Sequence, residues 1–263
     1  MVISDFFEPL YYNFKIMKST FEIKKTDGTI IFEYEAENNS VKKTLEEYIK
    51  KEKASIGIRE MVNLHNIDLF NANLRGIDLS NTDLKGSNLT AVNLEDAILI
   101  NADLRKTNLI HSKLNNADLS GAKLKCANLS EANLTNVNLS KADLSDADLL
   151  YTILNGANLS KANLERANLQ NANLKDSKIS GANFRVANLN SVKNLQYASC
   201  YFTRHGNEGK QLLAVKIDNE IILFCGYFKG NEAKYRERIE KGKKKYKTSR
   251  LIALETVLKL IEL

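Results

Sequence analysis

Three histidines are the side chains of this sequence best suited to acid–base catalysis, but their positions do not form a catalytic group. His65, His111 and His205 are scattered along the 263 residues, and no two of them have the spacing of a metal-binding pair. The sequence also contains no Gly-x-Ser-x-Gly nucleophile elbow and no Gly-rich phosphate loop. We therefore expect no catalytic residue and no cofactor, with the histidines exposed or incidental.

The cysteines and acidic residues do not predict a metal site either. Cys126, Cys200 and Cys225 include no Cys-x-x-Cys pair, which excludes a disulfide framework or a zinc cluster as the organising feature. The many Asn and Asp residues could suggest calcium, but the Gly-Gly-x-Gly-x-Asp pattern of nonapeptide β-helices is absent. Residues 1–15 lack the pattern of a secretory signal, and no apolar run approaches about 18 residues. We expect a cytoplasmic protein without a membrane partner.

A five-residue repeat fills the middle of the chain. Leu recurs every fifth residue from Leu64 to Leu174, and the register continues through Ile179, Phe184 and Leu189, which makes 26 units. We call this apolar position i. Position i−2 is small or β-branched throughout, and position i−1 is Asn or Asp in 21 of the 26 units.

A period of five fits neither an α-helix nor a continuous strand. On a helix the leucines would spiral around every side, and on a strand they would alternate between opposite faces. A coil that turns a corner after each short extended piece keeps positions i−2 and i pointing inward. The turn is expected at i+1 and i+2, because i+2 holds all five glycines of the repeat. These glycines are Gly76, Gly86, Gly121, Gly156 and Gly181.

The repeat resembles the pentapeptide repeat family. The segments NADLRKTNLI (101–110) and GANLSKANLERANLQNANL (156–174) match its consensus, and the match covers about half of the chain, 62–190. The resemblance implies a mainly β fold, the right-handed quadrilateral β-helix, with four pentapeptides or 20 residues in each coil. The 26 units would then form about 6.5 coils.

The flanking sequences predict a cap at each end of the repeats. We expect an N-terminal α/β cap at 1–61, the β-helix at 62–195 and a basic C-terminal α/β module at 196–263. Asp27–Gly28 predicts a hairpin turn, and Ser40 precedes an expected helix at 41–54. In the C-terminal module, 211–228 predicts a hairpin that turns near Asp218–Asn219, followed by helices at about 231–241 and 248–262. This module resembles C-terminal modules of some bacterial and phage pentapeptide repeat proteins, from which we carry over no function.

The charge distribution weighs against the best-known activity of the family. The resemblance implies that some members bind DNA gyrase, a topoisomerase, as acidic mimics of DNA. Here the net charge is −1 for 1–60, +1 for 61–195 and +6 for 196–263. The repeat region is thus nearly neutral, and one column of outward positions is basic: Lys85, Arg105, Lys125 and Arg185. Nucleic-acid binding by this column and the basic tail is the alternative, although a Lys-rich stretch between helices is also typical of a solvated linker.

Outward apolar residues favour protein binding. Phe70, Ile110, Leu150, Tyr151 and Ile153 should project outward, and the first three share a column at 40-residue spacing. Such a row can mark a partner site or a homodimer contact, and it is equally consistent with scattered surface residues or with packing of the flanks. We expect a non-enzymatic interaction scaffold for an unknown protein partner. An enzyme in the tail is the alternative of a different class, and that segment contains no polar cluster to support it.

Overall fold

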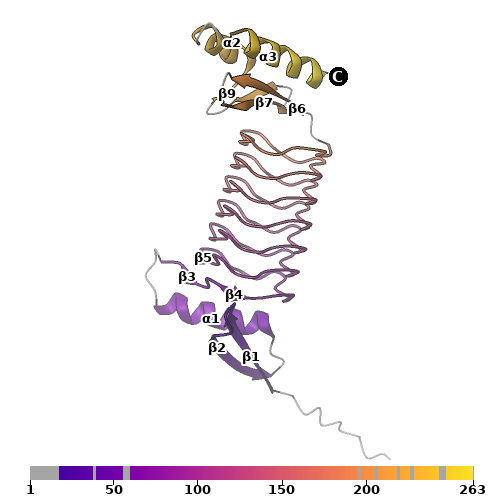
Figure 1. The fold of residues 1–263 in the computed structure, drawn as a ribbon. Helices are drawn as coiled ribbons and strands as arrows, with labels where there is room; N and C mark the ends of the chain where they lie inside the picture. Colours follow the sequence, from indigo (N-terminus) through magenta and orange to yellow (C-terminus); the bar gives the residue numbers. More distant parts are fainter. Residues whose placement is uncertain are drawn as a thin grey trace, which may run out of the picture.

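A stack of coils with an α/β unit at each end makes up the molecule (Figure 1). The computed structural model describes residues 18–37, 40–55, 60–194, 197–204, 207–217, 220–225, 228–242 and 247–262. The N-terminal elements are β1 (Lys18–Lys25), β2 (Ile30–Glu37) and α1 (Val41–Ser55), followed at the start of the stack by β3 (Val62–Asn63), β4 (Ile67–Asp68) and β5 (Thr82–Asp83). The C-terminal elements are β6 (Tyr197–Arg204), β7 (Asn207–Ile217), β8 (Glu220–Cys225), β9 (Phe228–Gly230), α2 (Glu232–Glu240) and α3 (Lys247–Glu262).

Residues 20 apart in the sequence are neighbours in successive coils. Parallel bridges join Asp68 to Asn88 and continue in this register up to Asn173 and Lys193, so one coil contains four pentapeptides. Three backbone hydrogen bonds per unit link the coils, for example from the amide of Leu94 to the carbonyl of Lys113 at 2.7 Å. Most units contribute a single bridging residue, and in the described stack only β3, β4 and β5 extend to two residues. Regular β-strands are scarce because two of the five residues in each unit lie in a turn.

The turns lie where the glycines predict them. Position i+2 has a positive φ in every unit from Asn66 to Ser191, and the values lie between 54° and 73°. In most units the amide at i+3 donates a hydrogen bond to the carbonyl of the apolar residue at i, as from Ala97 to Leu94 at 3.1 Å. A positive φ at the second central residue is the feature of a type II turn, which favours Gly and Asn. Most units nevertheless hold a residue other than glycine at this position.

The interior of the stack consists of the two inward positions of the repeat. The residues at position i are buried from Leu64 to Leu189, with only Ile179 partly exposed. The i−2 residues are buried beside them, except for the partly exposed Ala72 and Ser177. Phe184 replaces Leu at one position and is also fully buried. Burial of each Leu side chain stabilises the fold by roughly 1.5–3 kcal/mol before the loss of chain entropy. A single core thus runs the length of the stack.

The N-terminal unit covers the first coil. The hairpin β1–β2 turns through Asp27 and Gly28, and β1 pairs antiparallel with β4, so the hairpin extends an edge of the stack. The hydroxyl of Ser40 accepts a hydrogen bond from the amide of Lys43 at the start of α1. On the inner side of α1, Leu45 and Ile49 are buried in the same core as the first repeats. This arrangement protects the open end of a solenoid from solvent and from pairing with another chain.

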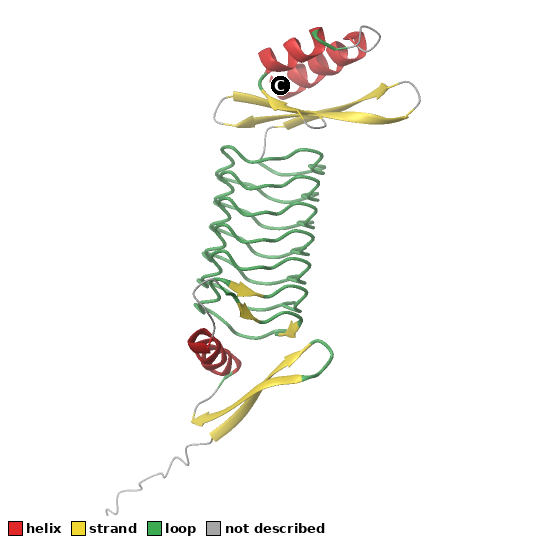
Figure 2. Cartoon of the chain, turned by 90° about the vertical axis from the view of Figure 1, so that its left-hand side faces the viewer, coloured by secondary structure: helices red, strands yellow, loops and turns green. Residues whose placement is uncertain are grey.

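The C-terminal unit covers the other end with a sheet that has a core on each side. Its strands lie in the order β6-β7-β8-β9, across the end of the stack, with α2 and α3 on the far side (Figure 2). Because side chains alternate along β7, Val215 joins the core of the stack, whereas Leu212 and Ala214 join a second core with Leu254 of α3. The sequence predicts only the β7–β8 hairpin, and the structure adds β6 and β9 at its edges.

Candidate partner surface

Side chains at the outward positions form columns along the stack. Residues at i−1, i+1 and i+2 stack on their counterparts 20 residues away because the coils keep a constant register. At a strand spacing of about 4.8 Å, one column presents a regular row of side chains to a partner. The chemistry of the surface is therefore decided by which residues occupy each column.

The Asn and Asp column at i−1 serves the fold. The Oδ1 atom of Asn88 accepts hydrogen bonds from the amide and hydroxyl of Thr90, and Nδ2 of Asn88 donates to Oδ1 of Asp68 at 2.8 Å. The same side-chain pairing joins Asn188 to Asn168 at 2.9 Å. These oxygens are thus committed to holding the corners and linking the coils. Among the residues that the structure describes, no group of three or more His, Cys, Asp or Glu could hold a metal ion.

The basic column is largely paired with carboxylates. Arg105 binds the buried Asp103 through two nitrogens, with Nε 2.7 Å from Oδ1 and Nη2 2.5 Å from Oδ2. Arg185 forms an ion pair with Glu165, and the Nζ atom of Lys125 lies 3.9 Å from Oδ2 of Asp146. Lys85, Arg105 and Lys125 are exposed and Arg185 is half-buried. The column that the sequence presents as basic is therefore a row of mixed charge, which weakens it as a surface for phosphates.

Arg105 also influences the ionisation of Asp103. Burial by itself would raise the pKa of Asp103, but the side-chain and backbone hydrogen bonds from Arg105, with its charge, outweigh burial and bring the pKa below its ordinary value. A second pair behaves similarly, since the hydrogen bond and charge of Arg166 lower the pKa of Asp146. Both carboxylates are therefore held ionised in the folded chain at neutral pH.

The predicted apolar residues all lie outside the core, but only some of them lie together. Phe70 is 61% exposed, and Ile110 and Leu150 are partly buried in the same column, separated by Thr90 and Ser130. Four coils separate Phe70 from Leu150, or about 19 Å at the usual strand spacing. A continuous apolar row along this column is therefore absent.

Leu150, Tyr151 and Ile153 form one compact group, which we call the apolar corner. Tyr151 is 55% exposed at position i+2, and Ile153 is 41% exposed at the next i−1 position. Leu150 and Tyr151 form the turn itself, and the fully buried Thr152 separates them from Ile153. The apolar corner is the densest group of exposed apolar residues among the five that the sequence predicts.

Four exposed apolar residues of the described chain were not predicted from the sequence. They are Ile98 at 41% exposure, Val186 at 49%, Ile252 at 62% and Ile30 of β2 at 44%. The first two could have been found from the repeat, because Ile98 lies at i−1 and Val186 at i+2. Ile252 lies in α3, where the apolar residues form a broad stripe and no repeat marks the outer side.

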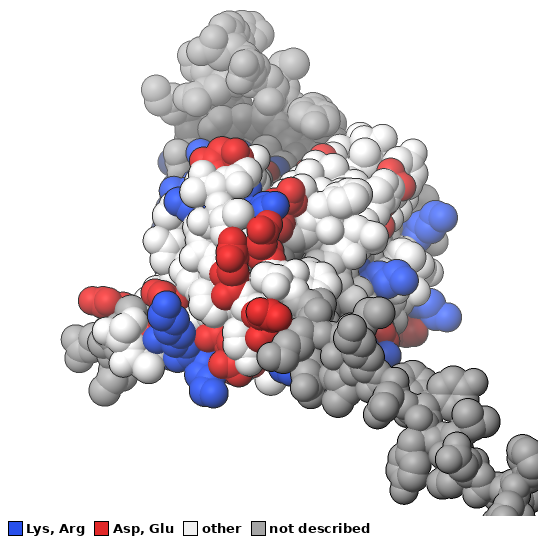
Figure 3. Space-filling model, turned by 90° about the horizontal axis from the view of Figure 1, so that it is seen from below, with Lys and Arg blue, Asp and Glu red and all other residues white. Residues whose placement is uncertain are grey.

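The N-terminal end of the molecule carries charges of both signs. Figure 3 looks at this end and shows acidic side chains in a line near its centre, with basic side chains mostly toward its sides. This mixture agrees with the net charge of −1 for residues 1–60. Neither the stack nor this end presents the uniform negative surface that a duplex mimic needs.

The repeats account for the family of the protein. A sequence model described as pentapeptide repeats matches residues 63–99, 87–125, 127–166 and 167–199, which together make up just over half of the chain. The chain belongs to the pentapeptide repeat family. A search of curated proteins gave no match for this pentapeptide repeat protein. None of the helices in the described ranges is long and apolar enough to cross a membrane.

Solved structures of other pentapeptide repeat proteins resemble parts of this chain. Rfr23 from the cyanobacterium Cyanothece is 29% identical over 42% of this chain and 90% of its own, with a TM-score of 0.34. A protein of the Arabidopsis thaliana thylakoid lumen is 32% identical over 43% of this chain and 68% of its own, with a TM-score of 0.19. The plasmid-mediated fluoroquinolone resistance protein QnrB1 is 19% identical over 52% of this chain and 79% of its own, with a TM-score of 0.41. With TM-scores below 0.5, these likenesses say nothing about the partner of this chain.

Proposed function

We propose that this pentapeptide repeat protein is a non-enzymatic, cytoplasmic scaffold that binds another protein through the apolar corner. In this proposal the chain has three units, with boundaries near 61 and 195, and the stack is the right-handed quadrilateral β-helix of about 6.5 coils. The observation that carries the proposal is the exposure of Tyr151 and Ile153 beside Leu150. Apolar groups gathered on a rigid surface are typical of protein-binding sites.

The backbone of Tyr151 adds a second reason. Its φ is 56°, in the left-handed region, where a bulky side chain costs about 1 kcal/mol or more. In the other coils the same column holds smaller or polar residues, among them Asn71, Ala91 and Asn171. The side chain of Tyr151 is more than half exposed, so burial of the ring contributes little to the stability of the fold. Tyr is also among the residues that most often dominate a protein interface.

The test compares two substitutions of the same kind. Tyr151→Asn removes the ring and places a favoured residue at the positive φ, and Val186→Asn makes an equivalent change at another exposed i+2 position, with a φ of 60°. The partner is first captured from the native cell with the wild-type chain and then titrated against the purified variants by calorimetry. We expect Tyr151→Asn to weaken binding at least about tenfold and Val186→Asn to leave it unchanged. Equal affinity of both variants for the partner would refute the role of the apolar corner.

A homodimer is the second form that this surface could support. Sedimentation of the wild-type chain and of Leu150→Lys distinguishes the two, because a charge placed at a self-association contact should dissociate the dimer. A monomer that Leu150→Lys leaves unchanged argues against self-association and leaves a different protein as the partner.

Nucleic-acid binding stays an alternative because residues 196–263 carry the net charge of +6. Its attraction would be Coulombic and would depend strongly on salt. The measurement is gel retardation of single-stranded and duplex DNA at about 50 mM salt, where such binding is strongest. No retardation at this salt concentration excludes the alternative.

A further inference from the structure

A pocket of about 460 Å³ lies beside α2 in the C-terminal unit, and most of the residues that line it are basic. The lining consists of Lys234, Glu237, Arg238, Lys241, Gly242 and Arg250. Four cations and one carboxylate give this lining a net charge of +3. Gly242 is the only residue of the lining without a polar side chain.

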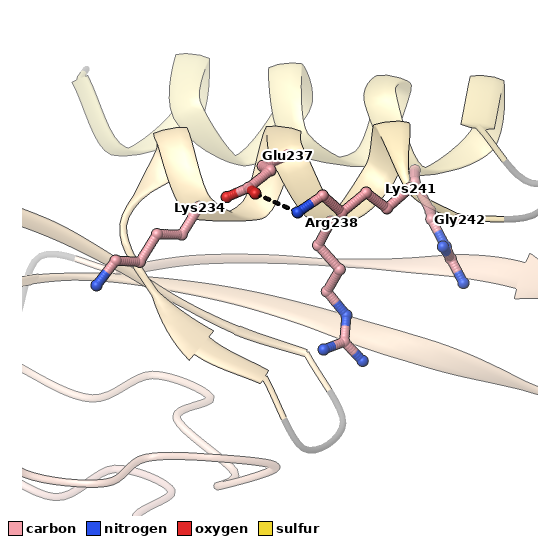
Figure 4. Close-up of a pocket in the computed structure, with 6 residues that line it drawn as sticks. Lys234, Glu237, Arg238, Lys241 and Gly242 are labelled. Carbon is pink, nitrogen blue, oxygen red and sulfur yellow. Dashed lines mark hydrogen bonds and ion pairs between the residues drawn. The ribbon is translucent and has the colours of Figure 1, made fainter.

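Helix geometry explains why these side chains come together. Lys234, Glu237, Arg238 and Lys241 have the spacing i, i+3, i+4, i+7, which places them on one side of α2. Figure 4 shows Lys234 and Arg238 leaving α2 toward the same side, while Lys241 turns to Glu237, with which it pairs at 2.5 Å. The one carboxylate of the lining is thus partly neutralised by its neighbour on the helix. The residues that α2 buries, Tyr235 and Ile239, lie on a different side and anchor the helix to the sheet.

Gly242 leaves room for the side chain that α3 contributes. A Cβ atom at this position would lie 2.7 Å from Nη1 of Arg250 and 3.2 Å from the carbonyl oxygen of Ile239. Its φ is not in the left-handed region, so a close approach and not a turn is what favours glycine here. The absence of a side chain lets the Arg250 guanidinium reach the end of α2, where it joins the cations of that helix.

We propose that this pocket binds the phosphate group of a small phosphorylated ligand. Guanidinium groups pair with two oxygens of a phosphate at once, and lysine ammonium groups add point charges around the same anion. Such a ligand gains affinity from the positive lining and needs no apolar contact. The inference stands apart from the proposed scaffold function, because the pocket lies in the C-terminal unit and the apolar corner lies in the stack.

The probe is inorganic pyrophosphate, titrated into the full chain by calorimetry. We expect saturable binding that Lys234→Gln with Arg238→Gln weakens at least about tenfold, since hydrogen bonds to charged groups contribute most of such affinity. Lys85→Gln with Lys125→Gln is the control, because it removes two exposed cations from the stack and the same total charge. Gly242→Ala should also weaken binding while it keeps all four cations, because the new methyl group displaces Arg250.

Every outcome of the pyrophosphate titration either supports or overturns the proposed phosphate site. Circular dichroism of every variant shows whether it is folded, and Lys234→Gln alone provides a milder change if the double variant is not. Loss of pyrophosphate binding only in the pocket variants supports the proposal. No saturable binding, or an equal loss in the control, overturns it. A DNA 12-mer identifies the source of the phosphate: binding lost in the pocket variants assigns the site to nucleic-acid phosphates, whereas DNA binding without pyrophosphate binding overturns the pocket as a site.

Discussion

At the scale of single residues, the corner positions show how neighbouring coils constrain each other. At Gly86, Gly121 and Gly156 a Cβ atom would lie 2.4–2.5 Å from the Oδ1 atom of an Asn in the preceding coil. At Gly76 the nearest such atom is the Lys42 ammonium at 4.0 Å. The sequence shows that glycine occurs at i+2, but only the structure separates glycines needed for space from those that merely suit the turn.

The glycines give a paired prediction. Gly156→Ala should lower the free energy of unfolding by about 1–2 kcal/mol, because it adds the contact with Asn136 to the cost of a positive φ. Gly76 has nearly the same φ as Gly156, 68° against 67°. Gly76→Ala should therefore cost only the free energy of placing an alanine at a positive φ. Urea denaturation of the two variants and of Asn136→Ala with Gly156→Ala measures the difference. An equal loss in both single variants, or no recovery in the double variant, would contradict the steric explanation.

The Arg105–Asp103 pair gives a pH prediction. Because the pKa of Asp103 is lowered in the folded state, the pair stabilises the fold above the unfolded carboxyl pKa of about 4, and this contribution is lost as the pH falls through the lower folded value. Arg105→Gln should therefore destabilise the chain at pH 7 and cost progressively less in acid. Urea midpoints from pH 7 down to about pH 2 follow the effect, with Lys85→Gln as the control. A cost for Arg105→Gln that does not change with pH would rule out this linkage.

At the scale of elements, the sequence predicts best what repeats. The buried leucines from Leu64 to Leu174 and the turn glycines are visible because each position recurs. The edge strands β6 and β9 were missed because no periodic pattern marks them, and β9 has only three residues. The ion pairs of Arg105 and Arg185 also escaped prediction. Arg105 pairs with Asp103 in a neighbouring column, and Arg185 pairs with Glu165 one coil away in its own column, so both pairs depend on side-chain directions. The three residues of the apolar corner are close in the sequence and were predicted to project outward, whereas their exposed fractions come only from the structure.

The helix α1 provides a test of the capping role. Leu45 is fully buried between α1 and the first coil, so Leu45→Ala should lower the free energy of unfolding by about 2–5 kcal/mol and expose the open end to aggregation. Ile252→Ala truncates an apolar side chain that is 62% exposed on α3 and should cost less than about 0.5 kcal/mol. Thermal unfolding with light scattering measures both effects. Similar costs for the two variants would show that α1 does not cap the stack.

At the scale of the whole molecule, charge and shape point to a partner other than a duplex-binding enzyme. The repeat region has a net charge of +1, and its basic column is interleaved with carboxylates. We therefore expect the purified protein to leave DNA gyrase supercoiling unchanged, with and without a quinolone. Protection of gyrase at stoichiometric protein would contradict this expectation and would require recognition without a uniform negative surface.

The central claim, that the apolar corner contacts a protein partner, is tested most directly by photo-crosslinking in the native cell. A photoreactive phenylalanine placed at Tyr151 should yield one discrete crosslinked protein, because its ring lies where the partner binds. The same residue at Val186, which is 49% exposed at an equivalent turn position, should yield none. Crosslinks at neither site, or the same products at both, would contradict the account.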